Sequence, residues 1–381
     1  MTRLVILTEI ISPYRIPLFN AIAKDSGISS HIIFLSETDP SLRQWPIYKE
    51  EMQFSYQVLP SWRKRLGKFN VLLNRGVGGA LSHSSPDVIL CGGYNYLASW
   101  QALRWARSHR IPFLLWSESN LQDARSGHAP VELLKSEFLR NCNGFVVPGK
   151  SARRYLLAHR IDEADIFFAP NAVDNDLFDT EALAARQNED ECRQDLGLPD
   201  RYFLFAGRLV REKGVCELLA AYEALDAQLR RRIGLVFAGD GIYRRQLEEQ
   251  ASSIVPGVIK FAGFVQREQL AKYYAFAEML VLPTYTDTWG LVVNEAMACG
   301  LPVIVSRTAG CAEDLVKEGW NGLLVSPRDV AGLALAMESL AERADLSDFG
   351  AHGKQKIAEY SAQEWSASTG RVVRKMAGTR D

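Results

Sequence analysis

Apolar and polar positions follow a repeated pattern through the first half of the chain. Short apolar runs recur at residues 4–7, 31–35, 88–91, 112–116 and 144–147, and stretches with helical periodicity separate them. Strands that are apolar on both faces are typical of a parallel sheet covered by helices on both sides. The intervening lengths suit crossover connections. This half therefore predicts a doubly wound α/β domain, residues 1–172.

The same pattern resumes in the second half, after a polar and acidic stretch. Apolar runs recur at residues 202–206, 234–238, 258–261, 279–282, 302–305 and 322–325. Residues 173–200 show turn residues and weak helical periodicity but no strand signal, which predicts a linker. The fold class that follows is α/β, with a second Rossmann-like domain at residues 201–360.

Length, composition and charge agree with this picture and exclude some functions. A chain of 381 residues exceeds what one hydrophobic core usually supports, which favours two domains. Lys and Arg number 44 against 45 Asp and Glu, so no overall positive field favours nucleic acid as a partner. The six cysteines form no CxxC pair and have no histidine at zinc-ligand spacing. They predict buried thiols in a reducing compartment.

The first ten residues predict a strand rather than an export signal, because the apolar run is short and no small-residue cleavage site follows. No apolar run is long enough for an ordinary membrane-spanning helix. We therefore expect a cytoplasmic protein whose membrane contact, if it has one, is peripheral. The segment WRKRLGK at residues 62–68, beside an expected apolar helix start at Phe69, would suit contact with anionic lipid, but solvated loop charges are the favoured interpretation.

The strongest motif is LPTYTDTWGLVVNEAMACGLP at residues 282–302, which predicts strand, loop, helix and next strand. Thr288 would cap the helix, and Gly300 followed by Pro302 would end it. A helix start at the carboxyl end of a parallel strand is an anion site. Asp287 and Glu295 flank it, and because carboxylates repel phosphate, they would accept hydrogen bonds from sugar and ribose hydroxyls. A capping Asp and a satisfied helix Glu are the alternative.

A second motif, YFLFAGRLVREKG at residues 202–214, places Arg208 and Lys213 in a glycine-rich turn after a strand. The two cations could clamp a diphosphate and stabilise the charge on a departing nucleoside diphosphate. Taken singly, they would be solvated surface cations. A third motif, LVFAGDG at residues 235–241, ends a strand in a glycine turn that could admit a ligand against the backbone.

Other chemistries have less support in the sequence. No GxGxxG or Walker loop follows a strand, which disfavours dehydrogenases and kinases. Asp174 and Asp176 form an Asp-x-Asp that could bind a metal, but they lie in the expected linker, where turn formation explains them.

Together these segments resemble the retaining glycosyltransferases of family 4, the group 1 family with the GT-B fold. The three motifs occur in the family's order, and PNAVD at residues 170–174 with Phe178 fits its linker signature. SPYR at residues 12–15 resembles the first loop of some members. The resemblance implies two domains facing each other across a cleft, with a C-terminal helix at about residues 361–381 crossing back onto the first.

The resemblance also implies roles for individual residues. Arg208 and Lys213 would hold the donor diphosphate, Glu295 the ribose and Asp287 the transferred sugar. Transfer would retain the anomeric configuration and need no metal or other cofactor, and the leaving phosphate would deprotonate the acceptor hydroxyl. The acceptor would be a glycan or glycolipid. The expected donor-binding set is Arg208, Lys213, Gly239, Gly241, Phe264, Asp287, Gly290, Leu291, Val292 and Glu295.

Two departures from the family pattern affect these expectations. Asp287 stands where most members carry Glu, and SES at residues 117–119 replaces an expected His. Glu118 could then orient the sugar or acceptor as a catalytic residue, or be a structural carboxylate. A phosphorylase, a nucleotide-sugar epimerase and a non-catalytic two-lobed sugar-binding protein are the rival functions.

Overall fold

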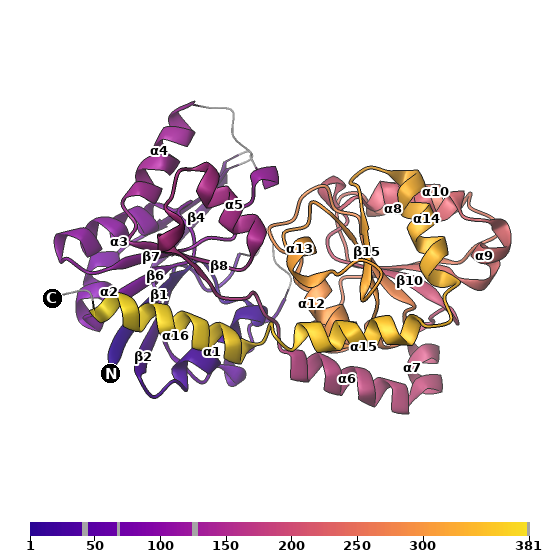
Figure 1. Ribbon diagram of the computed structural model, residues 1–381, viewed down its shortest axis with the longest axis horizontal. Helices are drawn as coiled ribbons and strands as arrows, with labels where there is room; N and C mark the ends of the chain where they lie inside the picture. Colours follow the sequence, from indigo (N-terminus) through magenta and orange to yellow (C-terminus); the bar gives the residue numbers. More distant parts are fainter. Residues whose placement is uncertain (40–44, 67–68, 124–128, 379–381) are drawn as a thin grey trace. The chain divides into compact units, whose positions relative to one another are not determined.

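The computed structural model describes residues 1–39, 45–66, 69–123 and 129–378. The chain forms two compact units (Figure 1). Unit 1 comprises residues 1–173 together with the C-terminal segment from residue 362, and unit 2 comprises residues 174–361. Each unit is a parallel sheet covered by helices on both faces, as the apolar runs predict.

Unit 1 is built on a seven-stranded parallel sheet in the order β3-β2-β1-β6-β7-β8-β9. One face packs against α1 and α16, and the other against α2, α3 and α5. The sheet strands are β1 (Thr2–Thr8), β2 (Ile28–Phe34), β3 (Ser55–Val58), β6 (Val88–Cys91), β7 (Phe113–Trp116), β8 (Gly144–Val147) and β9 (Ile166–Phe168). The helices are α1 (Ile16–Ala23), α2 (Val77–Ser84), α3 (Leu97–Ser108), α4 (Ala129–Arg140), α5 (Lys150–Ala158) and α16 (Ala362–Gly378), with short 3-10 turns at Pro13–Arg15, Lys49–Glu51, Leu121–Asp123 and Glu163–Asp165.

The C-terminal helix α16 groups with unit 1 because its apolar side is part of that unit's core. Trp365 is fully buried, with its ring 5.1 Å from that of Trp116 and 6.3 Å from that of Phe19. Arg374 of the same helix pairs with Asp25 at 2.9 Å. Chain segments from opposite ends of the sequence therefore share one hydrophobic core.

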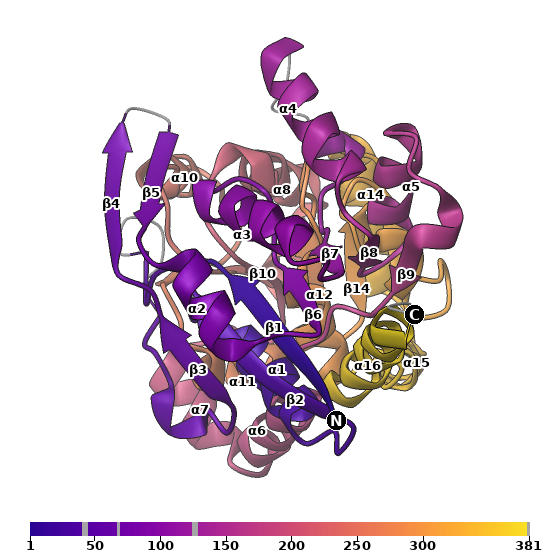
Figure 2. The same ribbon diagram turned by 90° about the vertical axis from the view of Figure 1, so that its left-hand side faces the viewer.

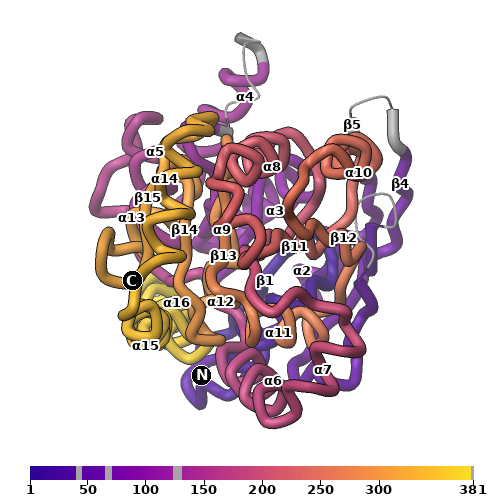
Figure 3. Tube along the Cα trace, turned by 90° about the vertical axis from the view of Figure 1, so that its right-hand side faces the viewer, coloured from indigo at the N-terminus to yellow at the C-terminus, as the bar shows by residue number. Residues whose placement is uncertain are grey.

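Unit 2 has a six-stranded parallel sheet in the order β12-β11-β10-β13-β14-β15. Helices cover both faces, with α8, α10 and α14 on one side and α6, α11, α12 and α15 on the other (Figure 3). The strands are β10 (Tyr202–Ala206), β11 (Gly234–Ala238), β12 (Ile259–Gly263), β13 (Met279–Leu282), β14 (Val303–Ser306) and β15 (Gly322–Val325). The helices are α6 (Asn175–Gln187), α7 (Glu189–Leu196), α8 (Val215–Ala224), α9 (Ala227–Arg232), α10 (Arg244–Ala251), α11 (Arg267–Phe276), α12 (Leu291–Ala298), α13 (Ala312–Leu315), α14 (Val330–Ala341) and α15 (Leu346–Ile357), with a 3-10 turn at Arg211–Lys213.

Residues 173–200, for which the pattern predicts a linker, contain the helices α6 and α7. The apolar residues Phe178, Ala182 and Ala185 of α6 are buried, and this helix packs against α11 and α12. The acidic residues that conceal this packing in the sequence lie on the exposed side of the helices.

The helix expected to start at Phe69 is absent, and that prediction is wrong. Residues 69–74 form β5 (Phe69–Asn74), which pairs with β4 (Ser61–Leu66) in an antiparallel hairpin. Leu72 is buried and Leu73 is 42% exposed, which is the alternation of a strand. Residues 67–68 of the WRKRLGK segment, and the side chains of residues 65–70, lie outside the described residues.

None of the helices in the described ranges combines the length and the apolar character that a bilayer crossing requires.

Candidate functional site

The two central strands of unit 2, β10 and β13, are neighbours whose chain connections leave in opposite directions. The chain continues from β10 to β11 on one side and from β13 to β14 on the other. Ligands of open α/β sheets bind outside the carboxyl ends of the strands at such a point. The loops after Ala206 and Leu282 are therefore the expected binding region of this unit.

Backbone hydrogen bonds join these two loops. The Glu212 carbonyl accepts hydrogen bonds from the Thr284 hydroxyl and the Tyr285 N–H, each at 2.8 Å. Gly214 has φ of 68°, and a Cβ there would lie 2.1 Å from the Pro283 carbonyl oxygen. Only glycine permits this close approach, so the two loops have a fixed relative position.

The joined loops bring Lys213 and Asp287 into contact as an ion pair. Both side chains are largely removed from solvent, at 17% and 15% exposure. The Asp287 carbonyl also accepts a hydrogen bond from the Gly310 N–H at 3.0 Å, which ties the loop after β14 to the same region. Two residues 74 positions apart in sequence thus meet at the carboxyl edge of the sheet.

The helix α12 begins beside this ion pair. Its N-cap is Gly290, with φ of 100° and no side-chain cap, so the prediction that Thr288 caps the helix is wrong. A Cβ on Gly290 would lie 3.7 Å from the Asp287 carboxylate and 3.1 Å from the Leu282 side chain. Glycine is needed here for its positive φ.

The first N–H groups of α12 are available for an anion. Within the described part of the chain, the N–H groups of Leu291 and Val292 make no hydrogen bond, whereas the Val293 N–H donates to the Gly290 carbonyl at 2.9 Å. Unpaired N–H groups at a helix start carry partial positive charge and attract phosphate or carboxylate. The helix ends as predicted, since Gly300 has φ of 73° after the last turn.

Glu295 lies one turn into α12 and contacts a buried tyrosine that the sequence did not single out. The Tyr274 hydroxyl, on α11, donates to the Glu295 carboxylate at 2.8 Å. Removal from water raises the pKa of Glu295 to about 7, although the hydrogen bond from Tyr274 acts in the opposite direction. The residue as a whole is intermediate between buried and exposed.

Gly239 and Gly241 pack closely against the backbone of the loop after β10. A Cβ at Gly239 would lie 1.8 Å from the Gly207 carbonyl oxygen, and one at Gly241 would lie 2.4 Å from that of Leu209. The Leu209 N–H also donates to the Asp240 carbonyl at 2.9 Å. These glycines therefore let the loops after β10 and β11 pack together, which fixes the turn that carries Arg208 and Lys213.

Arg208 and Phe264 lie in more open surroundings than Lys213. Arg208 is exposed, and among the described residues its guanidinium has no hydrogen bond or ion pair. Phe264 follows β12 at the edge of the sheet and is 42% exposed. The structure thus gathers Lys213, Asp287 and the start of α12, whereas in the described part of the chain Arg208 makes no hydrogen bond or ion pair with them.

Glu118 belongs to unit 1, where it follows β7. Its carboxylate pairs with the Arg15 guanidinium at 3.4 Å, and Arg15 also donates to the Thr8 hydroxyl at 2.9 Å and lies over the Trp116 ring at 4.5 Å. Thr8 ends β1, so this group lies at the carboxyl edge of the sheet of unit 1. The ion pair with Arg15 fixes the position of the Glu118 side chain. The sequence did not predict this pair.

Asp174 caps a helix in this structure. Its carboxylate accepts a hydrogen bond from the Leu177 N–H at 3.0 Å at the start of α6, and Asp176 lies in the first turn. Both positions complement the helix dipole. Within the described ranges, no group of three or more His, Cys, Asp or Glu side chains could hold a metal ion.

The six cysteines are free thiols. Cys91, Cys299 and Cys311 are buried, but Cys142, Cys192 and Cys216 are partly exposed, so the prediction of buried thiols holds for half of them.

Comparisons with known proteins agree on one family. The sequence profile described as "Glycosyl transferases group 1" matches residues 188–356, and the profile "Glycosyltransferase Family 4" matches residues 20–177. The sulfoquinovosyl transferase SQD2 of Arabidopsis thaliana is 30% identical over 312 residues, which is 76% of this chain and 54% of that protein. The matched regions span 39%, 54% and 43% of the length of the first three curated relatives, so the chain spans about half of each.

Solved structures show the same architecture. Anabaena HepE, solved with UDP and glucose, has a TM-score of 0.77 at 16% identity and covers 98% of this chain and 100% of its own. The lipopolysaccharide outer core galactosyltransferase WaaB has a TM-score of 0.72 at 16% identity over 98% of this chain and 99% of its own.

Proposed function

Because the chain belongs to the group 1 glycosyltransferases of family 4 and has their GT-B fold, we propose that it moves a sugar from a nucleoside-diphosphate sugar to a hydroxyl acceptor. The observation that carries the proposal is the meeting of Lys213, Asp287 and the start of α12 at the carboxyl ends of β10 and β13. The arrangement offers a cation, two unpaired N–H groups and two carboxylates within adjoining segments.

The proposed donor contacts follow from charge. Lys213, Arg208 and the α12 start would hold the diphosphate, because all three present positive charge or N–H donors. Glu295 would accept hydrogen bonds from the ribose hydroxyls, with Tyr274 fixing its carboxylate. Asp287 would accept hydrogen bonds from the transferred sugar. HepE was solved with UDP and glucose, which supports a nucleotide sugar as donor.

In the proposed reaction, the bond between the anomeric carbon and the donor phosphate oxygen breaks as the acceptor oxygen bonds to the same carbon. The acceptor proton passes to the leaving phosphate, and the configuration is retained. Lys213 and the α12 N–H groups would stabilise the negative charge that grows on the departing diphosphate, so no metal ion is required. Lys213 and the α12 N–H groups are in place before the reaction, so the protein does not have to rearrange as the charge develops.

We propose a glycan or glycolipid of cell-surface polysaccharide synthesis as acceptor. The likeness to a lipopolysaccharide galactosyltransferase supports this class. An acceptor of this kind presents hydroxyl groups whose oxygen can bond to the anomeric carbon.

The test is a transfer assay with purified protein, a panel of nucleotide sugars and glycan or glycolipid acceptors. Proton NMR of the product gives the anomeric configuration, and EDTA tests metal dependence. We expect release of nucleoside diphosphate, a retained anomer and full activity in EDTA. Dependence on inorganic phosphate would instead indicate a phosphorylase, and formation of a free epimerised nucleotide sugar an epimerase.

A further inference from the structure

Charge is distributed unevenly in unit 1. The whole chain has a net charge of -1, yet residues 52–117 contain eight Lys or Arg and a single acid, Asp87. Asp87 is already paired with Arg3 at 2.9 Å. This segment forms the hairpin β4–β5 and the helices α2 and α3, which lie side by side on one face of the unit (Figure 2). We call this surface, together with the adjoining C-terminal end of α4, the basic face.

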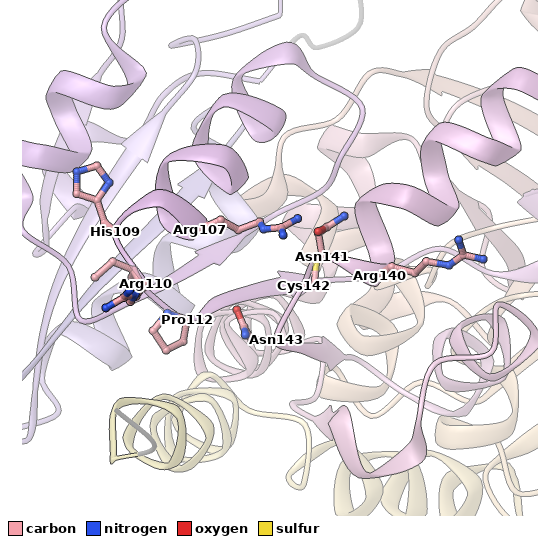
Figure 4. Close-up of a pocket in the computed structure, with 9 residues that line it drawn as sticks. Arg107, His109, Arg110, Pro112, Arg140, Asn141, Cys142 and Asn143 are labelled. Carbon is pink, nitrogen blue, oxygen red and sulfur yellow. The ribbon is translucent and has the colours of Figure 1, made fainter. Parts of the chain in front are cut away.

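Five arginines of unit 1 gather around two pockets on either side of the C-terminal half of α3. A pocket of 810 Å³ is lined by Arg107, Arg110 and Arg140, together with His109 (Figure 4). A second of 600 Å³ is lined by Arg75 and Arg104. Among the described residues, no acidic side chain lines either pocket. The first pocket lies at the amino ends of β7 and β8, at the opposite edge of the sheet from Glu118, and the second lies between the start of α2 and α3.

These arginines are exposed, and no partner for them lies among the described residues. Within the described part of the chain, none of the five guanidiniums makes a hydrogen bond, ion pair or ring contact. Helix dipoles account for some of the positive charge, since Arg107 and Arg140 lie in the last turns of α3 and α4. They do not account for Arg75 and Arg110, which lie outside helices. Unpaired positive charge in this number points to an anionic partner.

The hairpin adds apolar side chains to the basic face. Trp62 and Leu73 are directly opposite each other in the register of β4 and β5, so their side chains share one face. They are 52% and 42% exposed. The Arg75 N–H donates to the Pro60 carbonyl, so the strand pairing continues to this residue. Because side chains alternate between the two faces of a strand, Arg75 lies on the same side as Leu73, two positions before it. An exposed tryptophan on a hairpin that also carries arginine is typical of a segment at a membrane interface.

We propose that the basic face docks on an anionic phospholipid surface, with the five arginines contacting headgroup phosphates and Trp62 and Leu73 entering the headgroup layer. A soluble polyanion would explain the arginines but not the exposed apolar pair. Each arginine near an anionic membrane contributes about fivefold to partitioning, or ~1 kcal/mol. The inference does not rest on glycosyl transfer, because membrane binding is measured without a donor or an acceptor.

The test is co-sedimentation of the full chain with vesicles of phosphatidylglycerol and phosphatidylcholine, and with vesicles of phosphatidylcholine alone. We expect binding to the anionic vesicles only, weakened by salt. The double variant Arg104→Gln/Arg107→Gln should bind about 30-fold more weakly. The matched control is Arg231→Gln/Arg232→Gln, which removes the same charge from two exposed arginines in the last turn of α9 in unit 2.

The proposal fails if both double variants lose binding equally, since only net charge would then matter. It also fails if phosphatidylcholine binds as strongly, or if inorganic phosphate displaces the protein more than chloride of equal ionic strength, which would indicate a site for free anions. If Arg104→Gln/Arg107→Gln lowers the Tm, a second double variant, Arg75→Gln/Arg110→Gln, replaces it in the binding comparison. Both of its residues lie outside the helices, so the change should not destabilise a helix. Unchanged vesicle binding by that variant overturns the proposal.

Discussion

The Lys213 ammonium contacts the Asp287 carboxylate, and this ion pair joins the loop after β10 to the loop after β13. In the proposed function the two side chains have different ligands, the diphosphate for Lys213 and sugar hydroxyls for Asp287. Without a ligand, each neutralises the other in a place that is largely shielded from water. The pair therefore holds both side chains ready without leaving a buried charge unpaired.

Replacing Asp287 with Asn should separate nucleotide binding from transfer. The change removes the negative charge beside Lys213, so affinity for a nucleoside diphosphate should be unchanged or higher. Transfer should fall about 100-fold, because the sugar loses a charged hydrogen-bond acceptor. Calorimetric titration gives the first quantity and the turnover rate the second. Equal losses in both would show that Asp287 only positions Lys213.

Replacing Tyr274 with Phe should weaken nucleotide binding through Glu295. The change removes the hydrogen bond that fixes the Glu295 carboxylate and stabilises its charged form. We expect about a fivefold loss of nucleoside diphosphate affinity near neutral pH, from ~1 kcal/mol for the lost hydrogen bond. The double variant Tyr274→Phe/Glu295→Gln should bind no more weakly than Glu295→Gln alone. Additive losses would contradict an action through Glu295.

Nucleotide affinity should depend on pH through Glu295. Its pKa is raised to about 7, so below that pH the carboxyl is protonated and loses capacity to accept from ribose hydroxyls. Affinity should therefore fall as pH drops from about 8 to about 6, by about tenfold. The Glu295→Gln variant removes this titration but keeps that of the nucleotide phosphate. Parallel pH profiles for the two proteins would contradict the ribose role.

Replacing Gly239 with Ala should destabilise unit 2. The new methyl group would lie 1.8 Å from the Gly207 carbonyl oxygen, so the loops after β10 and β11 must separate. We expect the free energy of unfolding to fall by about 3 kcal/mol or more. Gly79→Ala is the control, since Gly79 lies in α2 with nothing within 4 Å of the new atom. That change should stabilise by about 0.5–1 kcal/mol. Denaturant unfolding measures both.

Most strands of the two sheets were predictable because nearly all of their residues are apolar, but β3 and β9 have no counterpart among the predicted runs. The runs at residues 88–91, 202–206 and 279–282 match β6, β10 and β13 residue for residue. The hairpin β4–β5 was missed because β4 is polar and its register depends on a partner strand. The helix α6 was missed because its acidic exposed side hides a buried apolar stripe. Patterns that depend on tertiary packing are weak in a single sequence.

The candidate site was only partly predictable. The motifs identified Lys213 and Asp287. Their two loops are joined by a main-chain hydrogen bond from the Tyr285 N–H to the Glu212 carbonyl, and a bond between main-chain groups cannot be predicted from residue types. Tyr274 gave no signal, because its contact with Glu295 joins two helices. Thr288 was predicted as the helix cap from its residue type alone. In the structure the N-cap is Gly290, which has a positive φ.

The most direct test of the donor site is calorimetric titration of UDP, GDP and ADP into the wild-type protein and the Lys213→Ala variant, with Lys317→Ala, an exposed lysine of unit 2, as control. The account predicts micromolar binding of one of these nucleotides, a loss of about 10- to 100-fold in Lys213→Ala and none in the control. Equal affinity of Lys213→Ala and wild type would contradict it.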